Sequence, residues 1–280
     1  MRLPVKLSDS FWPSWLYRFI GANLRKDPRI LVSGKAGADP DARSKAISCF
    51  KFGTTFKTTG YRRHRLSDEL VTPYFREEMT VLDIGASDGI TSLDLMEKVG
   101  FRFRRYFVSD YNLEVRYLWS GARCFFFSPE GACILIAGPL FVSYPGESGF
   151  VRRLHRRTLQ RLQPQLAQAP SLQLIHPRLA DLARQDDRIR ILRYNVFEPW
   201  NDEQPQLIKI ANVLNFNYFS TAEIEGALKN LLQTLPDSGL LLIVENRPGE
   251  QAALYRKNNG RFELLEKIGP GVDIHQLVIG

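Results

Sequence analysis

The sequence predicts an α/β fold built on a seven-stranded, mostly parallel β-sheet that ends in an antiparallel hairpin. Three observations favour it. Short apolar runs alternate with segments of helical periodicity from residue 67 onward, the pattern of a parallel sheet covered by helices. The apolar run at residues 81–84 passes through a turn with two glycines into such a helical segment. Near the C-terminus, two extended segments flank Gly269-Pro270-Gly271, a linker short enough for a hairpin.

The glycine turn lies in the first predicted βαβ unit. Residues 83–89 read Asp-Ile-Gly-Ala-Ser-Asp-Gly, residues 91–99 have helical spacing, and residues 105–108 form the second strand, followed by Asp110. A strand, a tight turn and a helix N-terminus direct backbone N–H groups and the positive end of the helix dipole to one point. This turn is therefore predicted to hold an anionic or polar group of a small molecule.

The rest of the sheet follows further along the chain. Strands are predicted at residues 188–196, 206–214 and 240–245, with a helix at residues 221–235 capped by Ser220 or Thr221. Residues 261–268 and 272–279 are predicted to form the final hairpin. A helix is predicted to begin with the cap Ser67-Asp68-Glu69 and to run to Phe75.

Two regions lie outside this pattern. Residues 1–66 are predicted to form an N-terminal extension, helical at first and then rich in loops, before the domain at residues 67–280. Residues 119–187 are predicted to be an insertion after the second strand, either a lid on the substrate side or a structural extension. Residues 10–26 have an amphipathic helical pattern, which indicates a helix packed on its own domain or, alternatively, a membrane anchor.

Composition indicates a protein that folds in the cytoplasm without a structural metal. The chain has 280 residues, 44% of them hydrophobic, and a net charge of +8, which allows a sizeable core and anionic partners. Its three cysteines and four histidines have no metal-like spacing. Cys124 and Cys133 are predicted to be free thiols. No apolar run reaches the roughly 18 residues of a transmembrane helix, so no transmembrane segment is predicted.

Two basic clusters are candidate docking surfaces. Interleaved cations and aromatic side chains can contact nucleic acid or an acidic protein, close over an anionic substrate group, or form a solvated surface. The oligomeric state cannot be read from the sequence. The arginines of the two clusters are Arg62, Arg63, Arg152, Arg153, Arg156 and Arg157.

Residues 83–89 resemble the first motif of class I S-adenosylmethionine-dependent methyltransferases, acid-x-Gly-x-Gly-x-Gly, with Ser87 at the position of the middle glycine. The resemblance covers about residues 68–118 and 186–280. Residues 196–199 and 211–219 are also similar to stretches of chemotaxis-receptor methyltransferases, but the first motif and the N-terminal region do not follow that subfamily. The resemblance implies a Rossmann-like fold and S-adenosyl-L-methionine as cofactor.

The resemblance also implies roles for individual residues. The glycines would let the backbone approach the methionine part of the cofactor, whose carboxylate would meet the loop amides. Asp83 would accept a hydrogen bond from the cofactor amino group, Asp110 would bind both ribose hydroxyls, and Tyr111 would pack on the adenine. The full set of expected cofactor residues is Asp83, Gly85, Ala86, Ser87, Gly89, Asp110, Tyr111, Asn195, Val196 and Asn212. Asn195 would accept a hydrogen bond from the adenine amino group.

Methyl transfer depends mainly on alignment of donor and acceptor, and a base is needed only if the nucleophile must lose a proton. Asn212 and Tyr218, with Asn215 and Asn217, follow the fourth strand and would orient the acceptor. His155 is the candidate base, and His64 is a second candidate. Either is a surface histidine if its segment does not fold over the cleft.

Three functions remain open from the sequence. The preferred one is methylation of an oxygen or nitrogen of a small-molecule or glycan-type acceptor. The second is an RNA or protein methyltransferase that docks through the basic clusters, and the third is a non-catalytic cofactor-binding scaffold. A nicotinamide-dependent dehydrogenase is disfavoured, because the Gly-x-Gly-x-x-Gly spacing is missing and no tyrosine is followed by lysine four positions later.

Overall fold

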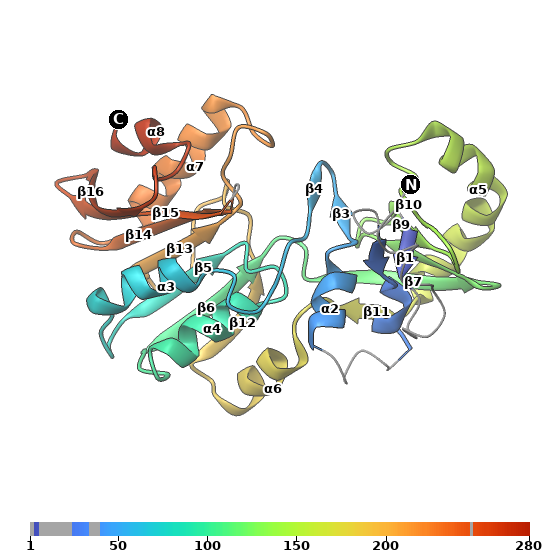
Figure 1. Ribbon diagram of the computed structural model, residues 1–280, viewed down its shortest axis with the longest axis horizontal. Helices are drawn as coiled ribbons and strands as arrows, with labels where there is room; N and C mark the ends of the chain where they lie inside the picture. Colours follow the sequence, from blue (N-terminus) through green and yellow to red (C-terminus); the bar gives the residue numbers. More distant parts are fainter. Residues whose placement is uncertain (1–2, 6–23, 34–39, 247–248) are drawn as a thin grey trace, which may run out of the picture. The chain divides into compact units, whose positions relative to one another are not determined.

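A computed structural model describes residues 3–5, 24–33, 40–246 and 249–280. The chain divides into two compact units, each made of two separate stretches of sequence (Figure 1). The large unit comprises Tyr61–Leu113 and Ile175–Gly280, and the small unit comprises Met1–Gly60 and Glu114–Leu174.

The large unit contains a seven-stranded sheet with the order β12-β6-β5-β13-β14-β15-β16. The first five strands are parallel, and the last two are antiparallel to their neighbours. The predicted fold class is therefore confirmed. The strands are β5 (Thr80–Ile84), β6 (Arg105–Asp110), β12 (Ile189–Arg193), β13 (Leu207–Ala211), β14 (Leu240–Asn246), β15 (Glu250–Asn258) and β16 (Arg261–Ile268).

Helices cover both faces of this sheet. Along β5, successive apolar residues point to opposite faces, so Val81 belongs to one core cluster and Leu82 to the other. The Val81 cluster includes residues of α3, α4 and α6, and the Leu82 cluster includes residues of α7 and α8. These helices are α3 (Arg65–Val71), α4 (Ile90–Lys98), α6 (Pro177–Gln185), α7 (Thr221–Thr234) and α8 (His275–Ile279).

The C-terminal antiparallel hairpin is confirmed, and its strand at residues 261–268 was predicted correctly, but its partner strand was placed on the wrong segment. Strands β15 and β16 form the hairpin, joined at Asn259 and Gly260, both of which have positive φ. Asn-Gly is the dipeptide that favours a two-residue hairpin turn, so a sequence signal for this position existed. Residues 272–279 do not form a strand. Ile274 precedes the short helix α8 and Val278 lies within it, and both are buried against the sheet.

The helix before the first strand begins earlier than predicted. Helix α3 starts at Arg65, and its N-cap residue, His64, makes no side-chain capping bond. Instead, the carboxylate of Glu250 on β15 accepts the N–H groups of Leu66 and Ser67 at 2.9 and 2.7 Å. A carboxylate at a helix N-terminus satisfies unpaired N–H groups and complements the dipole. The cap is thus supplied from 183 residues away in sequence.

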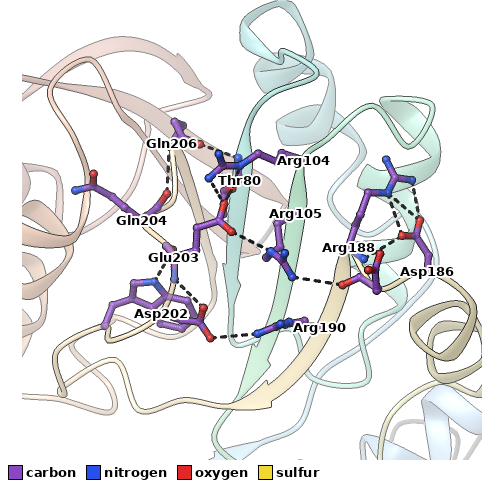
Figure 2. Close-up of polar contacts among 12 residues, drawn as sticks. Thr80, Arg104, Arg105, Asp186, Arg188, Arg190, Asp202, Glu203, Gln204 and Gln206 are labelled. Atoms are coloured by element: carbon purple, nitrogen blue, oxygen red, sulfur yellow. Dashed lines mark hydrogen bonds and ion pairs between the residues drawn. The ribbon is translucent and has the colours of Figure 1, made fainter.

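A polar network holds the loop before β13 against the amino ends of β5 and β6 (Figure 2). The Glu203 carboxylate accepts hydrogen bonds from the Thr80 hydroxyl and the Arg104 guanidinium, and from Arg105 Nε at 2.9 Å. The Gln206 side chain accepts the Thr80 N–H at 2.7 Å. Burial opposes ionisation of Glu203, but the bonds from Thr80 and Arg104 outweigh it and lower the pKa of the carboxyl.

The small unit is built on a five-stranded antiparallel sheet with the order β10-β9-β8-β7-β11. Its strands β8 and β9 pair across the turn Ser128-Pro129-Glu130-Gly131, and β7 and β11 were not predicted from the sequence. The strands are β7 (Glu114–Ser120), β8 (Arg123–Phe127), β9 (Cys133–Ala137), β10 (Val142–Ser143) and β11 (Ser171–Gln173). Cys49, Cys124 and Cys133 are free thiols.

The N-terminal region and the insertion share one core, although they were predicted to be separate parts of the chain. Ala46 of α2 (Pro40–Ile47) and Phe50 lie in the same buried cluster as Phe126 and Leu135 of the insertion. The Phe50 and Phe126 rings meet edge to face, 5.1 Å between centroids. The insertion also ends earlier than residue 187, because α6 belongs to the large unit. The insertion covers one face of its sheet with its own residues, among them Val151 and Leu162, and the N-terminal residues cover the other face.

Short elements complete the N-terminal region. Strands β1 (Leu3–Val5) and β2 (Leu24–Lys26) pair in parallel, and β3 (Lys51–Phe52) and β4 (Thr55–Phe56) form a small hairpin. The last three residues of the amphipathic helix predicted at residues 10–26 form strand β2 instead, and residues 10–23 lie outside the described residues. Over the part of the chain that the structure describes, no helix is both long and apolar enough to cross a bilayer.

Candidate functional site

The carboxyl edge of the large sheet contains the point where the strand order changes direction. The chain proceeds from β5 to β6 and β12 on one side, and from β13 to β14 on the other. Ligands of open α/β sheets bind beside such a point, outside the carboxyl ends of the strands. The segments that follow β5, β6, β12 and β13 carry most of the predicted site residues.

The glycine turn after β5 has the backbone that its sequence predicts. Gly85, Ser87 and Gly89 have φ angles of 75°, 60° and 79°. A Cβ atom on Gly85 would lie 2.2 Å from Val213 Cγ2, and one on Gly89 would lie 2.1 Å from Leu179 Cδ2. A side chain at either position would displace the Val213 or Leu179 side chain, and both φ angles lie in the region that favours glycine.

The amides of this turn make hydrogen bonds inside the protein. The N–H groups of Gly85 and Ala86 donate to the Ser109 carbonyl at 2.9 and 3.0 Å, and the Gly89 N–H donates to the Ala86 carbonyl at 2.8 Å. Each backbone N–H is a single donor. An anion could use these amides only by replacing those bonds, which weakens the prediction that they meet a cofactor carboxylate.

Asp110 connects the second strand to the glycine turn. Its Oδ2 accepts the Ser87 N–H at 2.9 Å, and its Oδ1 accepts the Asn112 N–H at 2.8 Å. These two bonds fix the orientation of the carboxylate. Tyr111 is 49% exposed, and the Arg193 guanidinium lies 4.4 Å from its ring centroid. Asp110 and Tyr111 are therefore held together at the tip of β6.

Asn195 and Val196 follow β12 at the same edge. The Asn195 side-chain oxygen accepts the Phe197 N–H at 3.2 Å, and its amide nitrogen donates to Glu198 Oε1 at 3.0 Å. Val196 is buried in the core beneath α7. Asn195 thus stabilises the turn after the strand, a role that the resemblance did not imply.

Asp83 faces the interior of the unit. Asp83 is only 1% exposed, and its Oδ2 accepts hydrogen bonds from the Ser92 and Tyr106 hydroxyls at 2.8 and 3.1 Å. Burial raises the pKa of this carboxyl, while Lys209 opposes the shift. The structure therefore provides Asp83 with partners other than the cofactor amino group predicted from the sequence.

Lys209 on β13 is completely buried and belongs to the same polar interior. Its Nζ donates to Asp68 Oδ1 of α3 at 2.8 Å. Burial disfavours the charge, but Asp68 and Asp83 outweigh burial and raise the pKa of the lysine. An ammonium in a low-dielectric interior is tolerated only when it is paired in this way. The cluster secures α3 to the sheet next to the candidate site.

Asn212, directly after β13, is bonded to the end of β14. Asn212 Nδ2 donates to Asn246 Oδ1 at 3.0 Å, and the Asn246 N–H donates to Asn212 Oδ1 at 2.9 Å. Arg63 Nε also donates to Asn246 Oδ1, at 3.1 Å. Burial lowers the pKa of Arg63 from its usual value, and no described carboxylate pairs with it. A half-buried guanidinium without an acidic partner is suited to an anionic ligand group.

The two candidate bases have different surroundings. His64 is 4% exposed, and neither ring nitrogen makes a hydrogen bond with a described residue. Burial, together with the charges of Lys209 and Arg63, lowers the pKa of His64 well below its ordinary value, although the nearby Asn246 amide favours the proton. His155 lies on α5 (Gly149–Leu162) of the small unit, edge-on to Phe125. Of the two, only His64 belongs to the large unit.

The segment after β13 is organised by Asn215. Its side chain is buried, its Oδ1 accepts the Asn217 N–H at 3.1 Å, and its carbonyl accepts the Tyr218 N–H at 3.1 Å. Tyr218 is half-buried, and Phe216 is 50% exposed. Asn215 therefore shapes this loop, while Phe216, Asn217 and Tyr218 are side chains of it that an acceptor can reach.

The contacts of Asn246 were not predicted from the sequence. Asn246 lies at the carboxyl end of the buried strand β14 and joins Asn212 to Arg63. A polar residue at the end of a buried parallel strand is a signal for this edge of the sheet, and that signal was present in the sequence. In the described ranges, no group of three or more histidine, cysteine or acidic side chains is arranged to hold a metal ion.

Comparison with known proteins finds similarity in structure alone. No family model and no curated protein matches the sequence. Similar solved structures include the N-methyltransferase NodS from Bradyrhizobium japonicum WM9, at 16% identity over 65% of this chain and 66% of that chain, with a TM-score of 0.34. Human N-acetylserotonin methyltransferase in complex with S-adenosylmethionine matches at 12% identity over 64% of this chain and 34% of that chain, with a TM-score of 0.32.

A third similar structure has another activity. The [4+2]-cyclase SpnF matches at 13% identity over 65% of this chain and 44% of that chain, with a TM-score of 0.33. The chain thus spans between about a third and two thirds of the length of these three proteins. Because one fold hosts many chemistries, similarity at this level leaves the activity to be inferred from the residues of the chain itself.

Proposed function

We propose that the large unit binds S-adenosyl-L-methionine at the carboxyl edge of its sheet and transfers the methyl group to an oxygen or nitrogen of a small-molecule or glycan-type acceptor. The observation that carries the proposal is the position of Asp110. Its carboxylate stands at the end of β6, oriented by the Ser87 amide of the glycine turn at 2.9 Å. This couples the acid after the second strand to the turn after the first, where the strand order changes direction.

The residues around Asp110 fit such a cofactor in part. The carboxylate can accept hydrogen bonds from ribose hydroxyls, and Tyr111 offers an aromatic surface for the adenine. The turn amides are bonded to Ser109 and Ala86, so we assign the cofactor carboxylate to Arg63, which is half-buried and unpaired with any acid among the described residues. Asp83 keeps its interior partners in this arrangement.

S-adenosyl-L-methionine supplies an activated methyl group, so the chain has to bind and orient the two reactants. Phe216 and Tyr218 would contact the acceptor, and Asn212 would hold the ends of β13 and β14 in place through Asn246. Burial lowers the pKa of His64, which favours its neutral form, but the same burial prevents direct contact with an acceptor unless α3 moves. Orientation of the acceptor therefore contributes more than proton removal.

The proposal is tested by calorimetric titration with S-adenosylmethionine and with S-adenosylhomocysteine. Asp110→Ala is expected to weaken binding by about 10- to 100-fold, because it removes hydrogen bonds to a charged group. The matched control is Asp186→Ala, which removes another carboxylate of the large unit, one bonded to Arg188 Nη2 at 2.7 Å before β12. The control should bind like wild type.

Arg63→Met is expected to weaken binding of both compounds, since both carry the same carboxylate. The proposal is wrong if wild type binds neither compound, or if Asp110→Ala binds as tightly as Asp186→Ala. Incubation with methyl-labelled cofactor and fractionated cell extract then identifies the acceptor.

A further inference from the structure

Helix α5 of the small unit presents an unusually basic surface. Arg152, Arg153, Arg156 and Arg157 are all exposed, and no acidic residue occurs in Gly149–Leu162. Among the described residues, none of these four arginines forms an ion pair. By contrast, Arg184 and Arg188 of the large unit are paired with nearby aspartates. The positive charge of α5 is therefore not neutralised by any residue that the structure describes.

The same helix exposes two large apolar side chains. Phe150 is 71% exposed and Leu154 is 63% exposed. They are four residues apart and so lie next to each other on the helix surface. The helix packs on the small-unit sheet through other residues, Val151 and Leu162, which are buried in the cluster of Phe125. Phe150 and Leu154 therefore contribute nothing to the core that anchors the helix.

This combination of side chains distinguishes between possible anionic partners. Nucleic acid needs cations for the phosphates and can use an aromatic ring for stacking, and these contacts do not require a second exposed apolar side chain beside the ring. A helix at a lipid interface needs both kinds of side chain, because apolar groups enter the boundary between head groups and acyl chains while arginines meet anionic head groups. The chemistry of α5 matches the second case.

We propose that α5 binds the surface of an anionic lipid bilayer, with Phe150 and Leu154 inserted and Arg153 and Arg157, which lie next to them on the helix surface, on the lipid phosphates. The binding is peripheral, because α5 has 14 residues and is attached to its own sheet. It is independent of the proposed methyl transfer, since every residue involved belongs to the small unit. One use of such a surface would be to bring the protein to an acceptor that is held in a membrane.

The proposal is tested by sedimentation of the full chain with lipid vesicles. Phosphatidylcholine vesicles containing about 30% phosphatidylserine are compared with vesicles of phosphatidylcholine alone. Wild type should bind the anionic vesicles at least about tenfold more tightly, and the difference should shrink as salt is added. The double variant Phe150→Ser/Leu154→Ser should lose about tenfold or more in affinity, and the triple variant Arg153→Gln/Arg156→Gln/Arg157→Gln should lose the preference for anionic lipid.

The matched control is Arg261→Gln/Leu264→Ser, which changes one exposed arginine and one leucine, 37% exposed, on β16 of the large unit. It should bind vesicles like wild type, and circular dichroism should show that all variants retain their helix content. Equal affinity of wild type for both kinds of vesicle overturns the proposal. The proposal is also overturned if the protein binds single-stranded RNA but not vesicles. In that case the arginine variant would lose RNA binding and the Phe150/Leu154 variant would keep it.

Discussion

Individual residues at the carboxyl edge are held by other parts of the chain before any ligand binds. Asp110 is oriented by two backbone amides, and Asn212 by the reciprocal bonds with Asn246. Such preorganisation reduces the ordering that a ligand must impose. The position of Asp110 could be predicted from the sequence, because it follows an apolar strand. The bonding of the turn amides could not, because it depends on the carbonyl of Ser109 in a different strand.

Asp94 makes a testable contribution to the pH dependence of stability. Burial raises the pKa of its carboxyl from 3.8 to about 6, although the Arg62 N–H bonded to it opposes the shift. Between these two values the folded state binds more protons than the unfolded state, so the free energy of unfolding falls as the pH rises through this window. Asp94→Asn should remove that part of the decrease, measured by urea denaturation at about pH 5 and about pH 7.5.

The control for this prediction is Asp186→Asn. Hydrogen bonds from Arg188 lower the pKa of Asp186, so its contribution is present at higher pH and is lost only as the pH falls below the ordinary aspartate range. Asp186→Asn should leave the difference in the free energy of unfolding between the two pH values unchanged. If Asp94→Asn also leaves it unchanged, Asp94 does not titrate as described.

At the level of elements, α3 is attached to the sheet by the buried pair Lys209–Asp68. Lys209→Met should lower the free energy of unfolding by about 3–5 kcal/mol, because it leaves Asp68 and Asp83 without a buried counter-charge. In the double variant Lys209→Met/Asp68→Leu the uncompensated charge of Asp68 is removed as well, so most of that loss should be recovered. Urea denaturation of the three proteins measures both effects. A double variant as unstable as the single one would contradict this account.

The helices and strands with strong local sequence signals were the ones that could be predicted. The parallel strands and α7 were predicted from periodicity, and the capping box of Ser220 and Glu223 defines the start of that helix. Strand β15 was missed although Asn259-Gly260 marks its end. Helix α3 was predicted to start too late because its cap, Glu250, comes from β15, a contact that no local pattern contains.

At the level of the whole molecule, the sequence did not predict that the N-terminal region and the insertion form one unit. Its core joins residues near Phe50 to the insertion strands of Phe126 and Leu135, and a contact between stretches so far apart in sequence has no periodic signature. Phe50→Ala should therefore loosen the insertion strands. The expected loss is about 3–5 kcal/mol for a buried phenylalanine.

Hydrogen exchange measured by mass spectrometry locates this effect. In Phe50→Ala, peptides from β7, β8 and β9 should exchange faster, while peptides from β5 and β13 should be unchanged. Phe262→Ala, which removes a buried ring from the large unit, should show the opposite pattern. Faster exchange throughout both units in Phe50→Ala would mean that the two units do not unfold separately.

The central claim is that the carboxyl edge of the large sheet is a binding site for S-adenosyl-L-methionine. A crystal structure of the protein grown with excess S-adenosylhomocysteine tests it most directly. We predict ribose hydroxyls within hydrogen-bonding distance of the Asp110 carboxylate and the amino-acid carboxylate next to the Arg63 guanidinium. A ligand bound elsewhere, or an edge that stays empty when S-adenosylhomocysteine is saturating, would contradict the claim.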